Sequence, residues 1–211
     1  MKPTAVRIYN YLAWSYRKHE SRFIDWLWNI NTGEKRSDAI PGYSDGHACE
    51  TLYYWHLKKI FKYLPAREDD VFVDLGCGYG RVLFYAATRG FKHVEGYEIR
   101  KELSDQIKIN IDKFETESFI EVELCDARKV NLYRVTVIYM FNPFGIDTLR
   151  QLMNRIMALN NSIRIAYVYN ESIDCRDYMD GLPWTGIEQV PGLPCKIYSF
   201  VPKPLYFTEG I

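Results

Sequence analysis

Four polar side chains stand where predicted strands end, and their types suit a nucleotide-like ligand. Asp74, Glu98, Asp126 and Asn142 each lie at or just after the end of an apolar, strand-like run. Carboxylate and amide oxygens accept hydrogen bonds from hydroxyl and amino groups. Ligands of open parallel sheets bind at the carboxyl ends of the strands, so we expect these side chains to share one crevice. The sequence has no C-x-x-C pair and no recognisable Ser-His-Asp triad, so neither a metal site nor covalent catalysis is predicted.

The predicted strand that carries Asp74 runs into a loop with glycine at three alternate positions, 76, 78 and 80. Residues 81–87 then show apolar side chains at helical spacing. Glycine allows the sharp turn and the close approach of a ligand to the backbone, and the following helix points unpaired N–H groups at the same place. A dinucleotide-binding loop reads G-x-G-x-x-G, whereas here the third glycine comes one residue early.

The run Asp74-Leu75-Gly76-Cys77-Gly78-Tyr79-Gly80 resembles the first motif of class I S-adenosylmethionine-dependent methyltransferases, an acid followed by Leu-Gly-x-Gly-x-Gly. The resemblance implies S-adenosylmethionine as the cofactor. It also implies that the backbone of Gly76, Cys77 and Gly78 passes under the methionine end, and that Asp74 helps to hold the ammonium group. The alternative role for Asp74 is to brace the loop through backbone N–H groups.

Two further acids fit the same resemblance. Glu98 lies 20 residues beyond Gly78, at the tip of the next strand, where an acid accepts hydrogen bonds from ribose hydroxyls; otherwise it is an acid exposed in a turn. Asp126 follows the third strand, where the family places an acid that accepts from the adenine amino group, and the N–H of Ala127 would then meet a ring nitrogen. Asp126 could equally cap a helix N-terminus.

Two weaker motifs predict which residues contact the molecule that accepts the methyl group. Asn142-Pro143-Phe144 resembles the Asn/Asp-Pro-Pro-aromatic motif of methyltransferases that act on nitrogen, although the second proline is missing. There the Asn oxygen accepts from the target amine and the aromatic ring stacks on a planar substrate. The alternative is an Asn-Pro turn that ends the strand.

Before the predicted helix 49–64, Glu50, Thr51 and Tyr53 resemble a Glu-Pro-Thr-x-Tyr segment that lines the pocket of small bacterial methyltransferases, here without the proline. We therefore expect Glu50 and Tyr53 beside the acceptor. Glu50 could instead stabilise the positive end of that helix.

The predicted fold class is α/β, a Rossmann-like doubly wound sheet of seven strands with helices on both faces. Five strands are expected to be parallel, and 185–190 and 195–201 to form a C-terminal antiparallel hairpin. Residues 1–48 are predicted to be an N-terminal extension and 49–211 the methyltransferase domain. The extension is predicted to begin with a helix, 3–30, that packs on the main domain; the alternative is a lid over the active site. The packing stripe is expected to consist of Val6, Tyr9, Ala13 and Tyr16, continued by Phe23, Leu27 and Ile30.

Composition limits the partners. The 211 residues carry 27 basic and 27 acidic side chains, so a net charge of zero disfavours nucleic acid without excluding it. Five scattered cysteines fit a reducing compartment, and we expect a cytoplasmic protein. The apolar runs are too short to span a bilayer, so no membrane partner is expected. Nothing in the sequence indicates an oligomeric state.

These features favour an S-adenosylmethionine-dependent methyltransferase acting on a nitrogen, such as a protein lysine or a small-molecule amine. One alternative is an NAD-dependent oxidoreductase of similar architecture, which the glycine spacing and the terminal hairpin disfavour. Another is a non-catalytic cofactor-binding module that holds a partner on its Tyr- and Trp-rich N-terminal helix.

Overall fold

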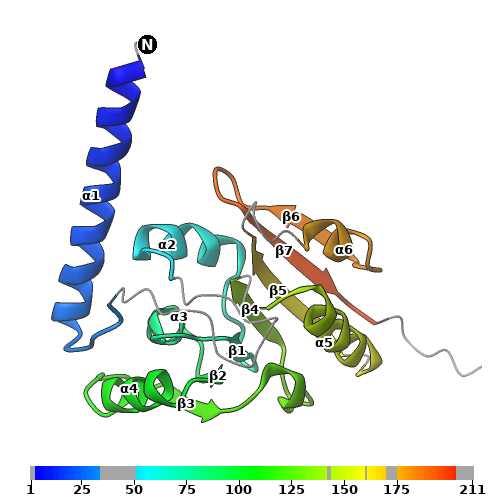
Figure 1. The fold of residues 1–211 in the computed structure, drawn as a ribbon. Coiled ribbons are helices and arrows are strands. Elements are labelled where there is room, and N and C mark those ends of the chain that lie inside the picture. The colour runs from blue at the N-terminus through cyan, green and yellow to red at the C-terminus, as the bar shows by residue number, and fades with distance from the viewer. Residues whose placement is uncertain (1–2, 34–50, 142–143, 160, 170–174, 203–211) are drawn as a thin grey trace, which may run out of the picture.

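The protein is built around one seven-stranded sheet (Figure 1). The computed structural model describes residues 3–33, 51–141, 144–159, 161–169 and 175–202, with side chains omitted for 3–6, 8 and 9. The sheet order is β3-β2-β1-β4-β5-β7-β6. The first five strands run parallel, and β7 is antiparallel to both β5 and β6. This arrangement confirms the predicted fold class, including the terminal hairpin.

The strands lie close to their predicted positions. Their bounds are β1 (Val71–Leu75), β2 (His93–Glu98), β3 (Phe119–Leu124), β4 (Val137–Phe141), β5 (Ile163–Val168), β6 (Gly186–Gln189) and β7 (Cys195–Phe200). All five residues of β1 are buried, because helices cover the sheet on both sides. Phe72 joins one hydrophobic cluster, while Val73 and Leu75 join the other, as the two-residue period of a strand requires.

Helices flank both faces of the sheet. One cluster takes in α2 (Tyr54–Tyr63), α3 (Arg81–Ala87) and α4 (Lys101–Ile111). The other takes in α5 (Ile146–Ala158) and α6 (Arg176–Asp180). A short 3-10 turn, η1 (Ala127–Lys129), follows β3.

The N-terminal helix α1 (Pro3–Leu27) differs from its prediction in two ways. It ends at Leu27 because Asn29 adopts a left-handed conformation (φ 55°), and the N–H of Ile30 donates to the carbonyl of Asp25 (2.9 Å). The predicted packing stripe was also wrong for Tyr16, Phe23 and Leu27, which are exposed, whereas Ile30, just beyond the helix, is buried as expected. Among the described side chains of α1, the buried ones are Ser21 and Asp25, which belong to a polar network with the domain, and Ile24 packs against the core beside them.

Helix α2 starts later than predicted, at Tyr54 rather than at residue 49. Residues 51–53 are described but not helical, and Tyr53 has an extended backbone. The carbonyl of Leu52 accepts from Arg81 (3.1 Å), and the N–H of Tyr54 donates to Ser21 Oγ (3.3 Å). These long-range bonds hold residues 51–53 outside the helix.

Candidate cofactor-binding and active site

The glycine loop between β1 and α3 is fixed to the end of β2. Gly76, Gly78 and Gly80 have φ values of 77°, 56° and 79°, a region that side chains with a Cβ rarely adopt. The N–H groups of Gly76 and Cys77 both donate to the carbonyl of Tyr97, at 2.9 and 3.2 Å. The N–H of Gly80 donates to the carbonyl of Cys77 (2.8 Å). The loop therefore follows a tight path at the tips of β1 and β2.

Glu98, the last residue of β2, is the carboxylate that holds this loop. Its Oε2 accepts from the N–H of Gly78 (2.8 Å), and its Oε1 accepts from the N–H groups of Ile99 and Arg100, both at 2.9 Å. Burial raises the pKa of Glu98, and the three amides oppose that rise. A carboxylate has about four lone-pair sites, so the contacts with described residues leave one acceptor position. The structure places Glu98 at the predicted strand tip, and its contact with a ribose stays a prediction.

Asp74 lies buried at the tip of β1, near Glu98. Burial raises the pKa of Asp74 well above its ordinary value, and the negative charge of Glu98 raises it further. The four loop amides described above have acceptors other than Asp74. Two acids in one buried region, with the loop amides bound elsewhere, make a place that favours a positively charged ligand group.

Tyr139 of β4 adds a polar group that sequence reasoning missed. It pairs with Asp74 across β1 and β4, and both residues are buried. Among the described residues its hydroxyl has no hydrogen-bond partner. Burial raises the pKa of Tyr139, and the nearby Asp74 contributes to the rise. A lone tyrosine in an apolar strand gives no sequence signal of this kind, because the pairing depends on the sheet register.

Asp126 acts as a cap in the structure. Its Oδ1 accepts from the N–H of Arg128 (2.9 Å) at the start of η1, and the Arg128 guanidinium binds the same carboxylate. The hydrogen bond from Arg128 is the main reason why the pKa of Asp126 is lowered. Ala127, partly exposed, is the first residue of η1. The N–H of Cys125 donates to the carbonyl of Glu98 (2.9 Å), which ties the end of β3 to β2. The adenine contacts of Asp126 and Ala127 stay predictions.

The predicted acceptor side is only partly described. Asn142, Pro143 and Glu50 lie outside the described residues. Phe144 is buried in the cluster beneath α5, so in this structure its ring belongs to the core, and its stacking on a substrate stays a prediction. Tyr53 is partly exposed before α2, and its ring stacks on His56 with centroids 5.8 Å apart. Burial is the main cause that lowers the pKa of His56 to about 4, so that ring is neutral at pH 7.

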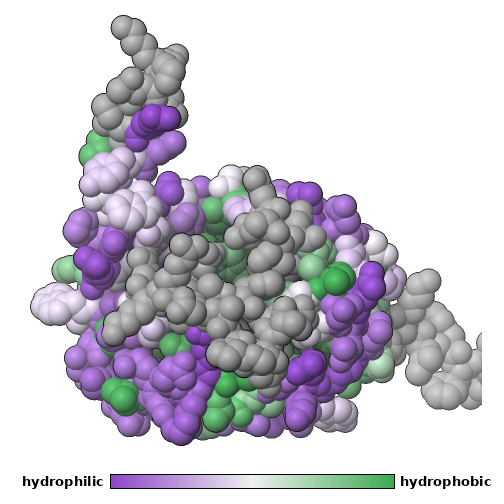
Figure 2. All heavy atoms as spheres, in the orientation of Figure 1, coloured by the Kyte–Doolittle hydropathy of each residue, from purple (hydrophilic) through white to green (hydrophobic). Residues whose placement is uncertain are grey.

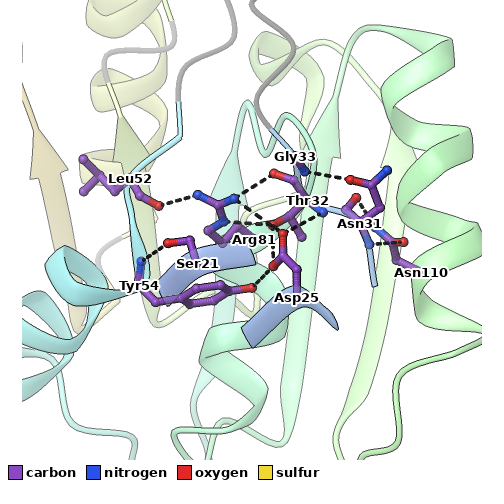
Figure 3. Close-up of polar contacts among 9 residues, drawn as sticks. All are labelled: Ser21, Asp25, Asn31, Thr32, Gly33, Leu52, Tyr54, Arg81 and Asn110. Atoms are coloured by element: carbon purple, nitrogen blue, oxygen red, sulfur yellow. Dashed lines mark hydrogen bonds and ion pairs between the residues drawn. The ribbon is translucent and has the colours of Figure 1, made fainter. Parts of the chain in front are cut away.

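A buried polar network behind the glycine loop joins the N-terminal segment to α3 (Figure 3). Arg81, the residue after Gly80, donates from Nε to Thr32 Oγ1 (2.8 Å) and from Nη2 to the carbonyl of Thr32 (3.0 Å). Its Nη1 donates to the carbonyl of Leu52 (3.1 Å), and Nη2 lies 3.6 Å from Asp25 Oδ2. One guanidinium thus binds three chain segments at once.

Asp25 is the centre of this network. It accepts from the hydroxyl of Thr32 at 2.8 and 2.7 Å, from the N–H of Thr32 at 3.2 Å and from the hydroxyl of Tyr54 at 2.7 Å. Nearby, Asn110 of α4 binds the backbone of Asn31 through both its amide nitrogen and its oxygen. Sequence reasoning missed this network, because its members are scattered between positions 21 and 110 and share no motif.

Searches for relatives point to the same fold. No protein-family model matches the sequence. A curated relative, a probable cobalt-precorrin-6B C(15)-methyltransferase (decarboxylating) from Archaeoglobus fulgidus, is 26% identical over 106 residues. That match spans 50% of this chain and 62% of the relative, less than two thirds of its length.

Two solved structures resemble most of the chain. An RNA methyltransferase from Salinibacter ruber, in complex with S-adenosyl-L-homocysteine, has a TM-score of 0.56 at 17% identity, over 74% of this chain and 96% of its own. A putative RNA methyltransferase from Pyrococcus horikoshii has a TM-score of 0.54 at 19% identity, over 78% and 94% of the two chains. The chain therefore has the class I methyltransferase fold.

The described part of the chain contains no cluster of three or more His, Cys, Asp or Glu side chains that could hold a metal ion. Within the same residues, no helix is long and apolar enough to cross a membrane.

Proposed function

We propose that the protein is an S-adenosylmethionine-dependent methyltransferase. The observation that carries the proposal is the burial of Asp74 and Glu98 together at the tips of β1 and β2, beside a loop of three glycines in the left-handed conformation. S-adenosylmethionine carries two positive charges, a sulfonium and an ammonium group. Its ribose needs a hydrogen-bond acceptor, which Glu98 supplies, and its adenine amino group would take the place of the Arg128 guanidinium at Asp126. The charge and the donor and acceptor types of the site therefore fit this cofactor.

The same charges argue against a dinucleotide. A pyrophosphate is anionic, and the glycine loop that binds it offers free backbone N–H groups. Here the N–H of Gly78 is already taken by the Glu98 carboxylate, and Asp74 adds a second acid to the same buried region. An anion beside this loop would be repelled by both carboxyl groups.

The residues of this chain would hold and align the cofactor and the acceptor, without forming a covalent bond to either. When bound, S-adenosylmethionine supplies a methyl group that an acceptor displaces directly from the sulfonium. Asp74, at the end of β1, would hold the ammonium group, and Glu98 would orient the ribose while keeping Gly78 in place. Asp126 and the N–H of Ala127 would meet the adenine. Alignment of this kind accounts for a large part of the rate enhancement in such a displacement.

We further propose a nitrogen as the acceptor, on a protein or on a small molecule. Support comes from Asn142-Pro143-Phe144, which follows β4 beside β1 in the sheet order. An amine must be neutral to attack, and the Asn142 oxygen would accept one of its hydrogens. Tyr53 and Glu50 would also face the acceptor.

Incubation with S-adenosylmethionine labelled in the methyl group, together with fractionated lysate, tests the activity and the acceptor. We expect the label in protein or in small molecules, with acid-stable N-methyl products. Label in RNA or on carbon would contradict the nitrogen acceptor and leave the methyltransferase activity standing. Absence of transfer to every fraction, together with enhanced fluorescence of added NADH, would favour an oxidoreductase and contradict the proposal.

A further inference from the structure

Helix α1 stands largely clear of the rest of the protein. Figure 1 shows it beside α2 and extending well beyond the sheet and its helices. Of its described side chains, Ser21 and Asp25 are the buried ones, and both lie in its C-terminal third. A helix of this length is marginal in water without a packed face, because helices in proteins draw most of their stability from burial. The projecting part of α1 therefore needs a partner.

The face of α1 that points away from the domain is apolar and aromatic. At 100° per residue, Leu12, Tyr16, Phe23, Trp26 and Leu27 fall within an arc of about 100°, on the side opposite Ser21 and Asp25. All five are exposed, with Trp26 at 72%. The resulting stripe, here called the α1 apolar stripe, is about 22 Å long.

Positive charge accompanies the stripe. Residues 3–33 and 51–64 contain seven basic and two acidic residues, a net charge of +5 in a chain of net charge zero. One of the two acids, Asp25, is buried against Arg81. Arg22 lies next to one edge of the stripe, and Lys18 and Arg7 follow farther round, on the polar side of the helix. In Figure 2 hydrophilic residues lie among paler and apolar ones on the projecting helix.

We propose that the α1 apolar stripe binds the surface of an anionic phospholipid membrane, with the helix lying in the interface. Helices of this kind combine Trp, Phe and Leu on one face with Lys and Arg on the polar face. Tyrosine and tryptophan are also the side chains that favour the headgroup region. Such a helix lies on the membrane surface. The expectation of no membrane partner rested only on the lack of a segment long enough to span the bilayer.

Two other occupants fit less well. A second copy of the chain would bring a segment with the same net positive charge against this one. A single-stranded nucleic acid needs a charged groove with π-faces for its bases, whereas the stripe is the convex side of a helix, and Leu12 and Leu27 offer no ring. Charge and side-chain type together favour the anionic bilayer.

Sedimentation with vesicles tests the proposal. The intact chain should bind vesicles of phosphatidylglycerol mixed with phosphatidylcholine, and bind pure phosphatidylcholine vesicles much more weakly. Tyr16→Glu with Phe23→Glu should weaken binding about tenfold or more. The matched control is Phe119→Glu with Tyr133→Glu, because Phe119 and Phe23 are exposed by 57% and 59%, and Tyr133 and Tyr16 by 74% and 66%. The control should bind like the unmodified protein.

A second set of variants measures the electrostatic contribution to vesicle binding. Arg7→Glu with Arg22→Glu should weaken binding to anionic vesicles several-fold, since each basic residue near such a surface contributes about 1 kcal/mol. Lys108→Glu with Lys113→Glu, exposed on α4 and just after it, changes the net charge equally and should have a smaller effect.

Three outcomes would overturn the proposal. The first is no binding to anionic vesicles, and the second is equal loss in the stripe variants and their control. The third is occupation by another partner: a dimer in analytical ultracentrifugation, or a complex with an oligo(U) RNA, that Tyr16→Glu with Phe23→Glu abolishes while vesicles stay unbound. None of these outcomes depends on the methyltransferase activity.

Discussion

Two buried aspartates in this protein have opposite surroundings. Asp25 accepts hydrogen bonds from Thr32 and Tyr54 and lies beside the Arg81 guanidinium. Asp74 lies near a second acid, Glu98. The chain itself supplies hydrogen-bond donors and a cation to Asp25, whereas Asp74 is buried beside a like charge.

The difference separates architecture from function. A buried charge whose partners come from its own chain stabilises the fold, as Asp25 does by joining α1 to α3. A buried acid beside another acid costs stability unless a positively charged ligand arrives. By this reasoning the network in Figure 3 is structural, and the tips of β1 and β2 are the ligand site. Four substitutions test the distinction.

The largest effect is expected for Arg81→Met. It leaves Asp25 buried without its cation and removes three hydrogen bonds, so the free energy of unfolding should fall by about 3–5 kcal/mol. Urea unfolding followed by circular dichroism measures this. Arg89→Met, an exposed change just after the same helix, should stay within about 0.5 kcal/mol of the unmodified protein. Equal stability of the two variants would show that the network is not structural.

Tyr54→Phe should have a smaller effect of the same sign. It removes the 2.7 Å hydrogen bond from the Tyr54 hydroxyl to Asp25, a bond to a charged acceptor, so stability should fall by about 2 kcal/mol. Thermal unfolding would show a lower midpoint. An unchanged midpoint would mean that Asp25 is satisfied without this hydroxyl.

Tyr139→Phe is the matched change at the ligand site, and its sign should be reversed. The Tyr139 hydroxyl is buried with no partner in the described structure, so its removal should raise the stability of the ligand-free protein by about 1 kcal/mol. A loss of stability as large as that of Tyr54→Phe would contradict the contrast between the two regions.

Asp74→Asn should give the smallest effect, one that depends on pH. The pKa of Asp74 is raised in the folded state, so its contribution to stability is present below about pH 4, the ordinary range for an aspartate, and is lost as the pH rises through the folded value. Asparagine does not titrate. The free energy of unfolding of the variant, relative to that of the unmodified protein, should therefore rise with pH by on the order of 1 kcal/mol.

Unfolding curves from pH 4 to pH 8 would show this gain. Asp105→Asn, a change in a partly exposed acid on α4, should give curves parallel to those of the unmodified protein. A difference between Asp74→Asn and the unmodified protein that stays constant with pH would mean that Asp74 does not titrate in this range.

Local patterns were enough to predict the sheet. The strands that end near Asp74 and at Glu98 were predicted correctly, because runs of strand-forming residues ended by polar or glycine signals specify them. The hairpin of β6 and β7 was likewise predictable from the turn between its strands. At the site, the sequence placed Asp74 and Glu98 at neighbouring strand tips, but it could not show that Glu98, rather than Asp74, holds the glycine loop.

What escaped prediction depends on contacts distant in the sequence. Arg81 is 56 positions from Asp25, and no local pattern links them. The late start of α2 follows from the same network, because Leu52 and Tyr54 direct backbone groups to Arg81 and Ser21. The predicted packing of the α1 stripe on the domain was wrong because helical periodicity indicates an apolar face but not what covers it.

Calorimetric titration with S-adenosylmethionine tests the central claim most directly. The unmodified protein should bind one equivalent, and Asp74→Asn and Glu98→Gln should each bind about tenfold or more weakly, while Glu121→Gln, an exposed acid on β3, should bind normally. Normal affinity in both site variants, or no binding by the unmodified protein, would contradict the assignment of the cofactor to the tips of β1 and β2.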